Sequence, residues 1–238
     1  MVSEKATILA IETATSSCSV ALLHSEEVYC RSQSGKNIHS QVVLSMIQEV
    51  LKEGSVNKAQ IDAIAVDQGP GSFTGLRIGV GVAQGLAFAL GCPMIAVTSL
   101  DILANQFILQ SSPKEGTHII AGIDARMSEL YWCDYEVISD NELRAIIVPQ
   151  VTRPESLLPS GKQARVAVGN AWSMYQGRFC QGLEDELVVQ EEIFEPEATS
   201  LLHLAERKYQ RKEFVNASEF RPFYVRNSVA KKSSKPLL

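Results

Sequence analysis

One pattern occurs twice in this sequence: an apolar strand ends in an acidic turn, and a second strand follows at once. The first copy is ATILAIETATSSCSVALLH at residues 6–24, and the second is HIIAGIDARMSELYWCDYEV at residues 118–137. Glu12 of the first copy matches Asp124 of the second. Alternating apolar residues and β-branched side chains are typical of strands. The repetition therefore predicts two similar halves.

A third strand is predicted after each copy, at residues 26–34 and 144–151. The first half then alternates helices with buried strands, at residues 37–52, 61–69, 74–90, 92–99 and 99–108. The second half is poorer in helix, with a strand-to-loop step at 164–172, an acid-rich loop or sheet edge at 184–197 and an amphipathic helix at 200–212. A duplicated three-stranded meander with helical crossovers is the plan of the actin/Hsp70/sugar-kinase (ASKHA) fold.

We therefore expect an α/β protein with two βββα-type halves. The first comprises residues 1–108 with part of the C-terminal segment 200–238, and the smaller second half comprises residues 109–199. A chain of 238 residues is long enough to bury a substantial core. The ASKHA fold binds ATP between its halves, which makes the acidic turns the expected nucleotide-proximal positions. These positions are Glu12, Thr13, Asp124, Arg126 and Gly169.

Bulk composition narrows the class of protein. The net charge of −5 argues against a general electrostatic grip on nucleic acid. The uncharged run at 78–90 is shorter than the ~20 residues that span a bilayer, so no membrane segment is expected. The five cysteines are scattered without a CxxC pair, which favours reduced thiols in a cytoplasmic protein.

The glycine-rich segment VDQGPGSFTGLRIGVGVAQGLAFALG, residues 66–91, allows two interpretations. A strand that leads through glycines into a helix start can bind phosphate. Here, however, Gly69, Gly71 and Gly75 form the pattern GxGxxxG, which is one residue longer than the dinucleotide-binding motif GxGxxG. The segment also lacks the lysine of a P-loop. Small residues instead recur every four positions from Gly75 to Gly91. This spacing favours close packing or partner docking over a phosphate site.

The helices predicted at 37–52 and 74–90 carry unusually few charges. Side by side they would present a weakly charged surface, which is the composition of an interface core. The alternative is that both helices are buried within the monomer. On the interface hypothesis the contact residues are Ile38, His39, Val42, Val43, Met46, Ile47, Phe73, Leu76, Arg77, Val80, Gln84 and Ala87.

Recognisable catalytic sets are missing from the sequence. The four histidines form neither HExxH nor HxxxH, and no GxSxG is present. The turns ETATSS and DARMSE lack the glycine that lets a phosphate approach the backbone, and the second contains Arg126. We therefore predict no catalytic residues and no metal site. The alternative is an ATP-binding enzyme of the kinase or ATPase class acting through Glu12 and Asp124.

Three motifs resemble one family closely. IETATSSCSVALL, QGPGSFTGLRIGVGVAQGLAFALGCP and IDARMSELYW, with the C-terminal RPFYVR, are similar to the bacterial TsaB (YeaZ) family. The resemblance implies a non-catalytic subunit of the machinery that places threonylcarbamoyl on N6 of adenosine 37 of tRNAs that read codons beginning with A. The donor is threonylcarbamoyl-AMP, and the transferase is the paralogue TsaD.

The resemblance also implies the partners. TsaD and the ATPase TsaE are expected to bind this chain, tRNA is expected only through the complex, and a homodimer is expected when the chain is alone. TsaD has a metal-binding HxxxH where this chain has Ser99 and Leu103, so the metal is expected to belong to TsaD. ATP or ADP with Mg²⁺ is expected only at the level of the complex.

The C-terminal segment RPFYVRNSVAKKSSKPLL has five basic residues and no acids. One hypothesis is that these residues contact tRNA phosphates; the alternative is a solvated or partner-ordered tail. The residues concerned are Arg221, Arg226, Lys231, Lys232 and Lys235.

Overall fold

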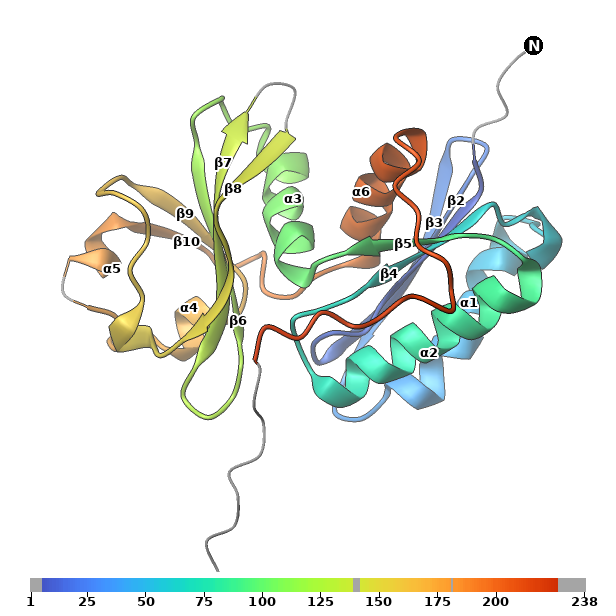
Figure 1. The fold of residues 1–238 in the computed structure, drawn as a ribbon, viewed down its shortest axis with the longest axis horizontal. Helices are drawn as coiled ribbons and strands as arrows, with labels where there is room; N and C mark the ends of the chain where they lie inside the picture. Colours follow the sequence, from blue (N-terminus) through green and yellow to red (C-terminus); the bar gives the residue numbers. More distant parts are fainter. Residues whose placement is uncertain (1–5, 139–141, 181, 227–238) are drawn as a thin grey trace, which may run out of the picture.

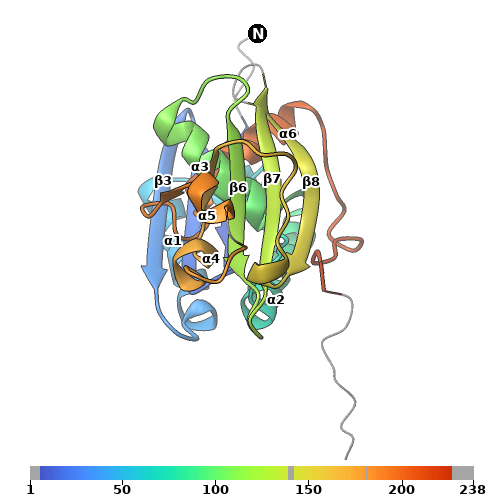
Figure 2. The same cartoon turned by 90° about the vertical axis from the view of Figure 1, so that its left-hand side faces the viewer.

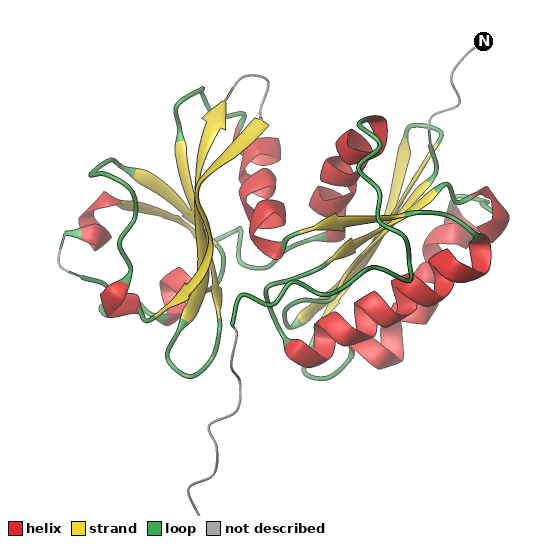
Figure 3. Cartoon of the chain, viewed as in Figure 1, coloured by secondary structure: helices red, strands yellow, loops and turns green. Residues whose placement is uncertain are grey.

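Two five-stranded sheets form the framework of the protein, as the computed structural model shows for residues 6–138, 142–180 and 182–226 (Figures 1 and 3). The first sheet has the order β3-β2-β1-β4-β5 and the second the order β10-β9-β6-β7-β8. The strands of the first sheet are β1 (Ile8–Glu12), β2 (Ser17–His24), β3 (Glu27–Ser34), β4 (Ala63–Asp67) and β5 (Met94–Val97). Those of the second are β6 (His118–Asp124), β7 (Leu130–Ile138), β8 (Glu142–Thr152), β9 (Arg165–Val168) and β10 (Leu187–Gln190).

The two sheets repeat one topology. β1 is antiparallel to β2 and parallel to β4, and β6 stands in the same relation to β7 and β9. The edge strands β5 and β10 are each parallel to their neighbours. This repetition confirms the ASKHA fold. The acid-rich stretch predicted as loop or edge contains β10, which is indeed an edge strand.

Long helices cover the first sheet, whereas the outer face of the second carries only short ones (Figure 2). α1 (His39–Glu53) and α2 (Phe73–Leu90) lie side by side on the outer face of the first sheet (Figure 1). In the second half, the corresponding crossovers contain the 3-10 turn η3 (Pro154–Ser156) and the short helices α4 (Ala171–Met174) and α5 (Leu183–Glu186). A further 3-10 turn, η1 (Lys58–Gln60), precedes β4.

Two helices are exchanged between the halves. α3 (Ser99–Ser111) follows β5 of the first sheet, but its Leu103 and Phe107 pack in a core with Ile119 of the second sheet. α6 (Ala198–Gln210) follows β10 of the second sheet, but packs on β1 and β2 of the first. α3 therefore contacts both halves, because its Ile102 packs in the core of the first half. The boundary expected at residue 108 stays a prediction.

A buried polar network joins the exchanged helices. The Asn105 side-chain amide donates to the carbonyl and the hydroxyl of Ser200, at 3.3 and 2.9 Å. The Ser200 hydroxyl in turn donates to the carbonyl of Ile102 at 2.8 Å. Buried polar groups are costly unless they are hydrogen-bonded. The network therefore fixes how α3 and α6 face each other, and with them the two halves.

α2 is long and apolar enough, by length and composition only, to cross a membrane. In this structure 33% of it is buried, and the buried side packs on β4 with α1 beside it. The remaining side is mostly apolar and is exposed or half-buried. An exposed apolar surface of this kind usually marks an interaction site.

Candidate functional site

The glycine-rich segment packs against the turn between β1 and β2. A Cβ at Gly71 would lie 2.3 Å from the carbonyl oxygen of Ala14, and one at Gly75 would lie 2.1 Å from that of Thr13. Ser72 donates its backbone N–H to the same Ala14 carbonyl at 2.6 Å. Glycine is needed here because the two backbones touch. The start of α2 thus covers the turn that would have to receive a phosphate, as the packing interpretation predicts.

Glu12 and Thr13, predicted as nucleotide-proximal, are buried in the first half. Their exposed fractions are 0% and 1%. The Glu12 Oε1 atom accepts the Ala14 N–H at 2.6 Å, and the Thr13 hydroxyl donates to the carbonyl of Gly75 at 2.9 Å. Neither residue lines the cavity between the halves. Neither side chain is therefore accessible from that cavity, and their proximity to a nucleotide stays a prediction.

Asp124 lines the cavity but is already engaged by its own neighbours. Its Oδ1 atom accepts the Tyr175 hydroxyl at 2.5 Å and the Arg126 backbone N–H at 2.9 Å. Burial and the neighbouring Asp124 carboxyl raise the pKa of Tyr175, so the hydroxyl keeps its proton. Gly169 is buried, and a Cβ there would lie 2.1 Å from the carbonyl of Gly122. Gly169 therefore serves strand packing.

The described residues do not fit the Mg-ATP site that the alternative of a kinase or ATPase requires within this chain. Glu12 is turned away from the cavity, Asp124 is hydrogen-bonded within its own half, and the first turn is covered by α2. At the positions of the TsaD histidines, Ser99 donates to Asp67 at 2.7 Å and Leu103 lies in the core. Across residues 6–138, 142–180 and 182–226, no three His, Cys, Asp or Glu side chains are grouped to hold a metal ion.

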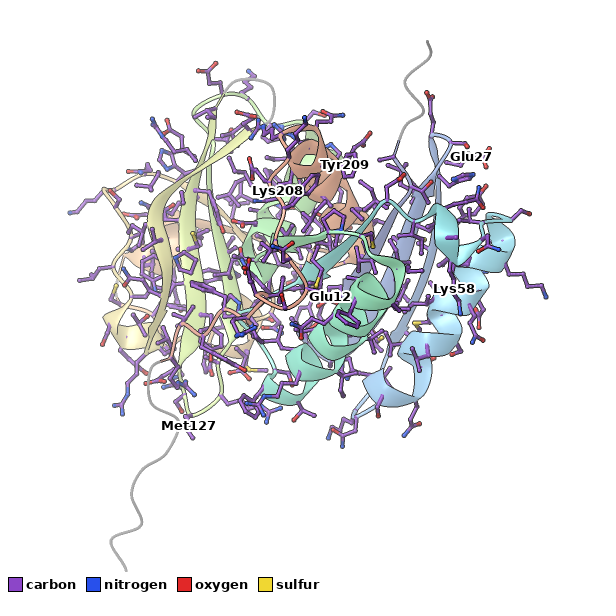
Figure 4. The ribbon with its side chains drawn as sticks, turned by 45° about the vertical axis from the view of Figure 1, so that its right-hand side comes forward. Glu12, Glu27, Lys58, Met127, Lys208 and Tyr209 are labelled. Atoms are coloured by element: carbon purple, nitrogen blue, oxygen red, sulfur yellow. The ribbon has the colours of Figure 1, made fainter. Side chains whose placement is uncertain are left out.

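A cavity of about 740 Å³ nevertheless lies between the halves. The turns after β1 and β6, the start of α2 and the C-terminal segment line it. The tip of the β6–β7 hairpin is unusual, because Arg126, Met127 and Ser128 all have positive φ, at 59°, 54° and 61°. Such a run is costly for residues other than glycine. Met127 at this tip is 71% exposed (Figure 4).

The C-terminal segment crosses the cavity and contacts both halves. Val215 pairs with Met94 beside β5, and Phe223 donates its N–H to the carbonyl of Gln68 at 2.7 Å. Arg226 then reaches the second half, where it donates to the Ala125 carbonyl at 3.1 Å and to Glu129 at 2.5 Å. Of the basic residues predicted to contact tRNA, Arg226 is thus used within the chain, as is Arg221, which donates to carbonyls of its own segment. Lys231, Lys232 and Lys235 lie outside the described residues.

Removing the Arg226 side chain is expected to loosen the β6–β7 tip. In Arg226→Ala, the amide exchange rates of residues 125–129 should rise by about tenfold or more, because the strained turn loses its contacts to the C-terminal segment. Hydrogen exchange followed by mass spectrometry measures this rise. Arg221→Ala is the matched control, and equal exchange in both variants would show that Arg226 does not hold the tip.

The α1–α2 face contains fewer of the predicted contact residues than expected. Seven of the twelve are buried within the chain itself, on the side of α1 and α2 that packs against the first sheet. These seven are His39, Val43, Met46, Ile47, Leu76, Val80 and Ala87. Ile38, Val42 and Gln84 are half-buried, while Phe73 and Arg77 are exposed.

Other residues form the exposed part of this face. Leu44 on α1 is 55% exposed and Phe88 on α2 is 82% exposed. On α2, a Cβ at Gly81 or at Gly85 would meet nothing within 4 Å. The spacing of four from Arg77 through Gly81 and Gly85 to Ala89 identifies an exposed row that the sequence analysis missed, because the buried small residues show the same spacing.

The comparisons with known proteins agree with this architecture. The family model described as "TsaD: tRNA N6-adenosine threonylcarbamoyltransferase" matches residues 33–234. A TsaB, the tRNA threonylcarbamoyladenosine biosynthesis protein of Escherichia coli K12, is 35% identical over 229 residues, which cover 94% of this chain and 96% of that relative. The chain belongs to the TsaB family.

A second TsaB sequence and a solved structure give similar matches. The TsaB of Haemophilus influenzae is 36% identical over 232 residues and 94% of each chain. YeaZ from Pseudomonas aeruginosa superposes with a TM-score of 0.83 at 37% identity, covering 92% of this chain and 99% of that one. The match therefore spans both halves.

Proposed function

We propose that this chain is a non-catalytic subunit in the biosynthesis of threonylcarbamoyladenosine in tRNA. It would act by binding TsaD, the subunit that transfers threonylcarbamoyl from threonylcarbamoyl-AMP to N6 of adenosine 37. The pathway follows from the names of its relatives. The observation that supports the scaffold role is the exposed face of α1 and α2, which contains the exposed apolar residues Leu44 and Phe88 and two open glycines.

The chemistry of this face suits a helical partner. Gly81 and Gly85 lie one turn apart with open space above them, so another helix could approach the α2 backbone closely. Aromatic residues such as Phe88 are typical binding hot spots. In the absence of TsaD, the same face could pair with itself around a twofold axis, and the homodimer is part of this proposal. TsaE would then join the assembled complex in the cytoplasm.

Charged residues on the exposed face are expected to prevent TsaD binding without unfolding the chain. Phe88→Asp and Leu44→Glu should each weaken binding by about 30-fold or more, since each places an unpaired charge at the centre of the interface. Co-purification with tagged TsaD, followed by titration calorimetry, measures the loss. Val148→Asp is the matched control, because Val148 is 65% exposed on β8 in the other half.

Full affinity in the Phe88→Asp and Leu44→Glu variants, with circular dichroism unchanged, would contradict this interface. Reconstituted tRNA modification with and without the chain tests the scaffold role itself. We also propose that ATP or ADP with Mg²⁺ binds only when the complex has formed. Calorimetry with Mg-ATP should therefore show no binding to the isolated chain, and micromolar binding with turnover lost in Asp124→Ala would instead support the ATPase alternative.

A further inference from the structure

Glu12 and Asp67 lie side by side at the ends of two neighbouring strands. β1 and β4 are parallel, and Ile11 pairs with Val66, so the next residue pair in this register is Glu12 with Asp67. Side chains alternate between the faces of a sheet. Both acids therefore lie on the same face as Ala10 and Ala65, whose cluster packs against α6.

Each carboxyl group has one oxygen that is satisfied and one that is not. Glu12 is 0% exposed and Asp67 is 1% exposed. Glu12 Oε1 accepts the Ala14 N–H, whereas Asp67 Oδ1 accepts the Gly69 N–H and the Ser99 hydroxyl, both at 2.7 Å. Glu12 Oε2 and Asp67 Oδ2 are fully buried and have no partner. Two adjacent buried carboxylates with unpaired oxygens would be very unfavourable if both were charged.

The surrounding charges do not relieve this repulsion. Asp101 on α3 acts on Asp67, and Glu195 and Glu197, just before α6, act on Glu12. Cys18 on β2 lies in the core on the opposite face of the sheet, and burial, with a smaller effect of the Glu12 charge, raises the pKa of its thiol to about 12, so it stays neutral. Burial and the Asp67 carboxyl raise the pKa of Glu12 well above its usual range, and burial also raises that of Asp67. None of the groups acting on the pair in the described chain is a cation.

We propose that Glu12 and Asp67 share one proton between Glu12 Oε2 and Asp67 Oδ2. A carboxylic acid donates to a carboxylate in a short, charge-assisted hydrogen bond, and this bond fastens the end of β1 to the end of β4. Both side chains are buried, and Glu12 lies in the interior of the molecule (Figure 4). Asp67 accepts a hydrogen bond from Ser99, where β5 leads into α3. Glu12, which the fold suggested as a nucleotide-binding acid, thus has a structural role where the two halves meet.

The shared proton makes stability depend on pH with a defined sign. A carboxyl group with a raised pKa in the folded state stabilises fully below its unfolded pKa, and the contribution is lost as pH rises through the folded pKa. The unfolding midpoint of the unsubstituted protein should therefore fall by several degrees between about pH 5 and about pH 9. In Glu12→Gln the amide donates the hydrogen bond at every pH, so the fall should shrink to about half or less.

Two further variants keep this test decisive. Asp67→Asn also removes one of the two facing carboxyl groups and should flatten the profile in the same way. Glu115→Gln is the control, because Glu115 is exposed before β6 and is not among the groups that act on the pair, and its profile should follow that of the unsubstituted protein. If Glu12→Gln and Asp67→Asn retain the full fall between about pH 5 and about pH 9, the shared proton is excluded.

A measurement on the unsubstituted protein does not depend on whether a variant folds. Carbon-13 NMR of labelled Glu and Asp carboxyl groups should show, near pH 7, one buried carboxyl resonance with the shift of a protonated acid. Two resonances with the shifts of carboxylates would overturn the proposal. A rise in the unfolding midpoint on adding Na⁺ or Mg²⁺, lost in Glu12→Gln, would also overturn it, because a cation would then replace the proton.

Discussion

Replacing Arg165 with methionine is expected to lower the free energy of unfolding by about 3–5 kcal/mol, because it leaves a buried carboxyl group without its partner. Arg165 and Asp134 both have side chains that are 0% exposed, and their N–O distance is 3.2 Å. The guanidinium also donates to the carbonyl of Gln163 at 2.8 Å, to that of Ser160 and to Glu186. A single side chain thus joins β7, β9 and the loop between β8 and β9.

The loss in Arg165→Met should grow as pH rises. Burial raises the pKa of Asp134 even with Arg165 present, and the arginine acts to lower it. Without the arginine, the folded-state pKa of Asp134 rises further, so the group is neutral at low pH and must ionise while buried at high pH. The Arg165→Met variant therefore keeps part of its stability at low pH and loses it as the pH rises through the raised pKa of Asp134.

Urea denaturation at several pH values measures this effect, with Arg178→Met as the matched control. Arg178 pairs with Glu155 at 2.7 Å, but its side chain is 39% exposed. A surface pair of this kind contributes about 0–1 kcal/mol. Equal losses in the two variants would show that burial of the Arg165 pair has no special cost. An Arg165→Met, Asp134→Leu double variant should recover most of the loss, because it leaves no unpaired charge in the core; Glu186, which also loses the arginine, is partly exposed.

The architecture was predictable because it depends on local patterns that occur twice. The apolar strands that end at Glu12 and Asp124, and the meanders that follow them, predict the two similar sheets correctly. The placement of the C-terminal segment with the first half, where α6 packs, was also expected. The packing of α3 on the second sheet was not predictable in this way. Sequence periodicity shows that a helix has an apolar side, but it does not show which sheet covers that side.

The candidate site was harder to predict for a related reason. Val80 and Phe88 are both apolar residues of α2, yet one is 4% exposed and the other 82% exposed. The difference arises from how the helix is rotated on the sheet, which is a tertiary property. Likewise, Glu12 occupies the expected turn, but its side chain points into the core beside Asp67, a neighbour that only the strand register identifies.

The glycines of α2 provide the second large effect, in which one substitution has opposite outcomes at two positions. In Gly75→Ala the new Cβ would lie 2.1 Å from the carbonyl oxygen of Thr13. That oxygen belongs to the backbone of the β1–β2 turn, so no flexible side chain can move aside. We expect a loss of about 2–3 kcal/mol in the free energy of unfolding, because α2 and the turn must separate.

In Gly81→Ala the same methyl group meets nothing within 4 Å. Alanine is favoured over glycine by about 1 kcal/mol in a helix interior, so this variant should be slightly more stable than the unsubstituted protein. Thermal and urea unfolding of both variants measure the difference. If Gly75→Ala were as stable as Gly81→Ala, the β1–β2 turn could move away from α2 at little cost. The close packing that excludes a phosphate from this turn would then not be a fixed property of the fold.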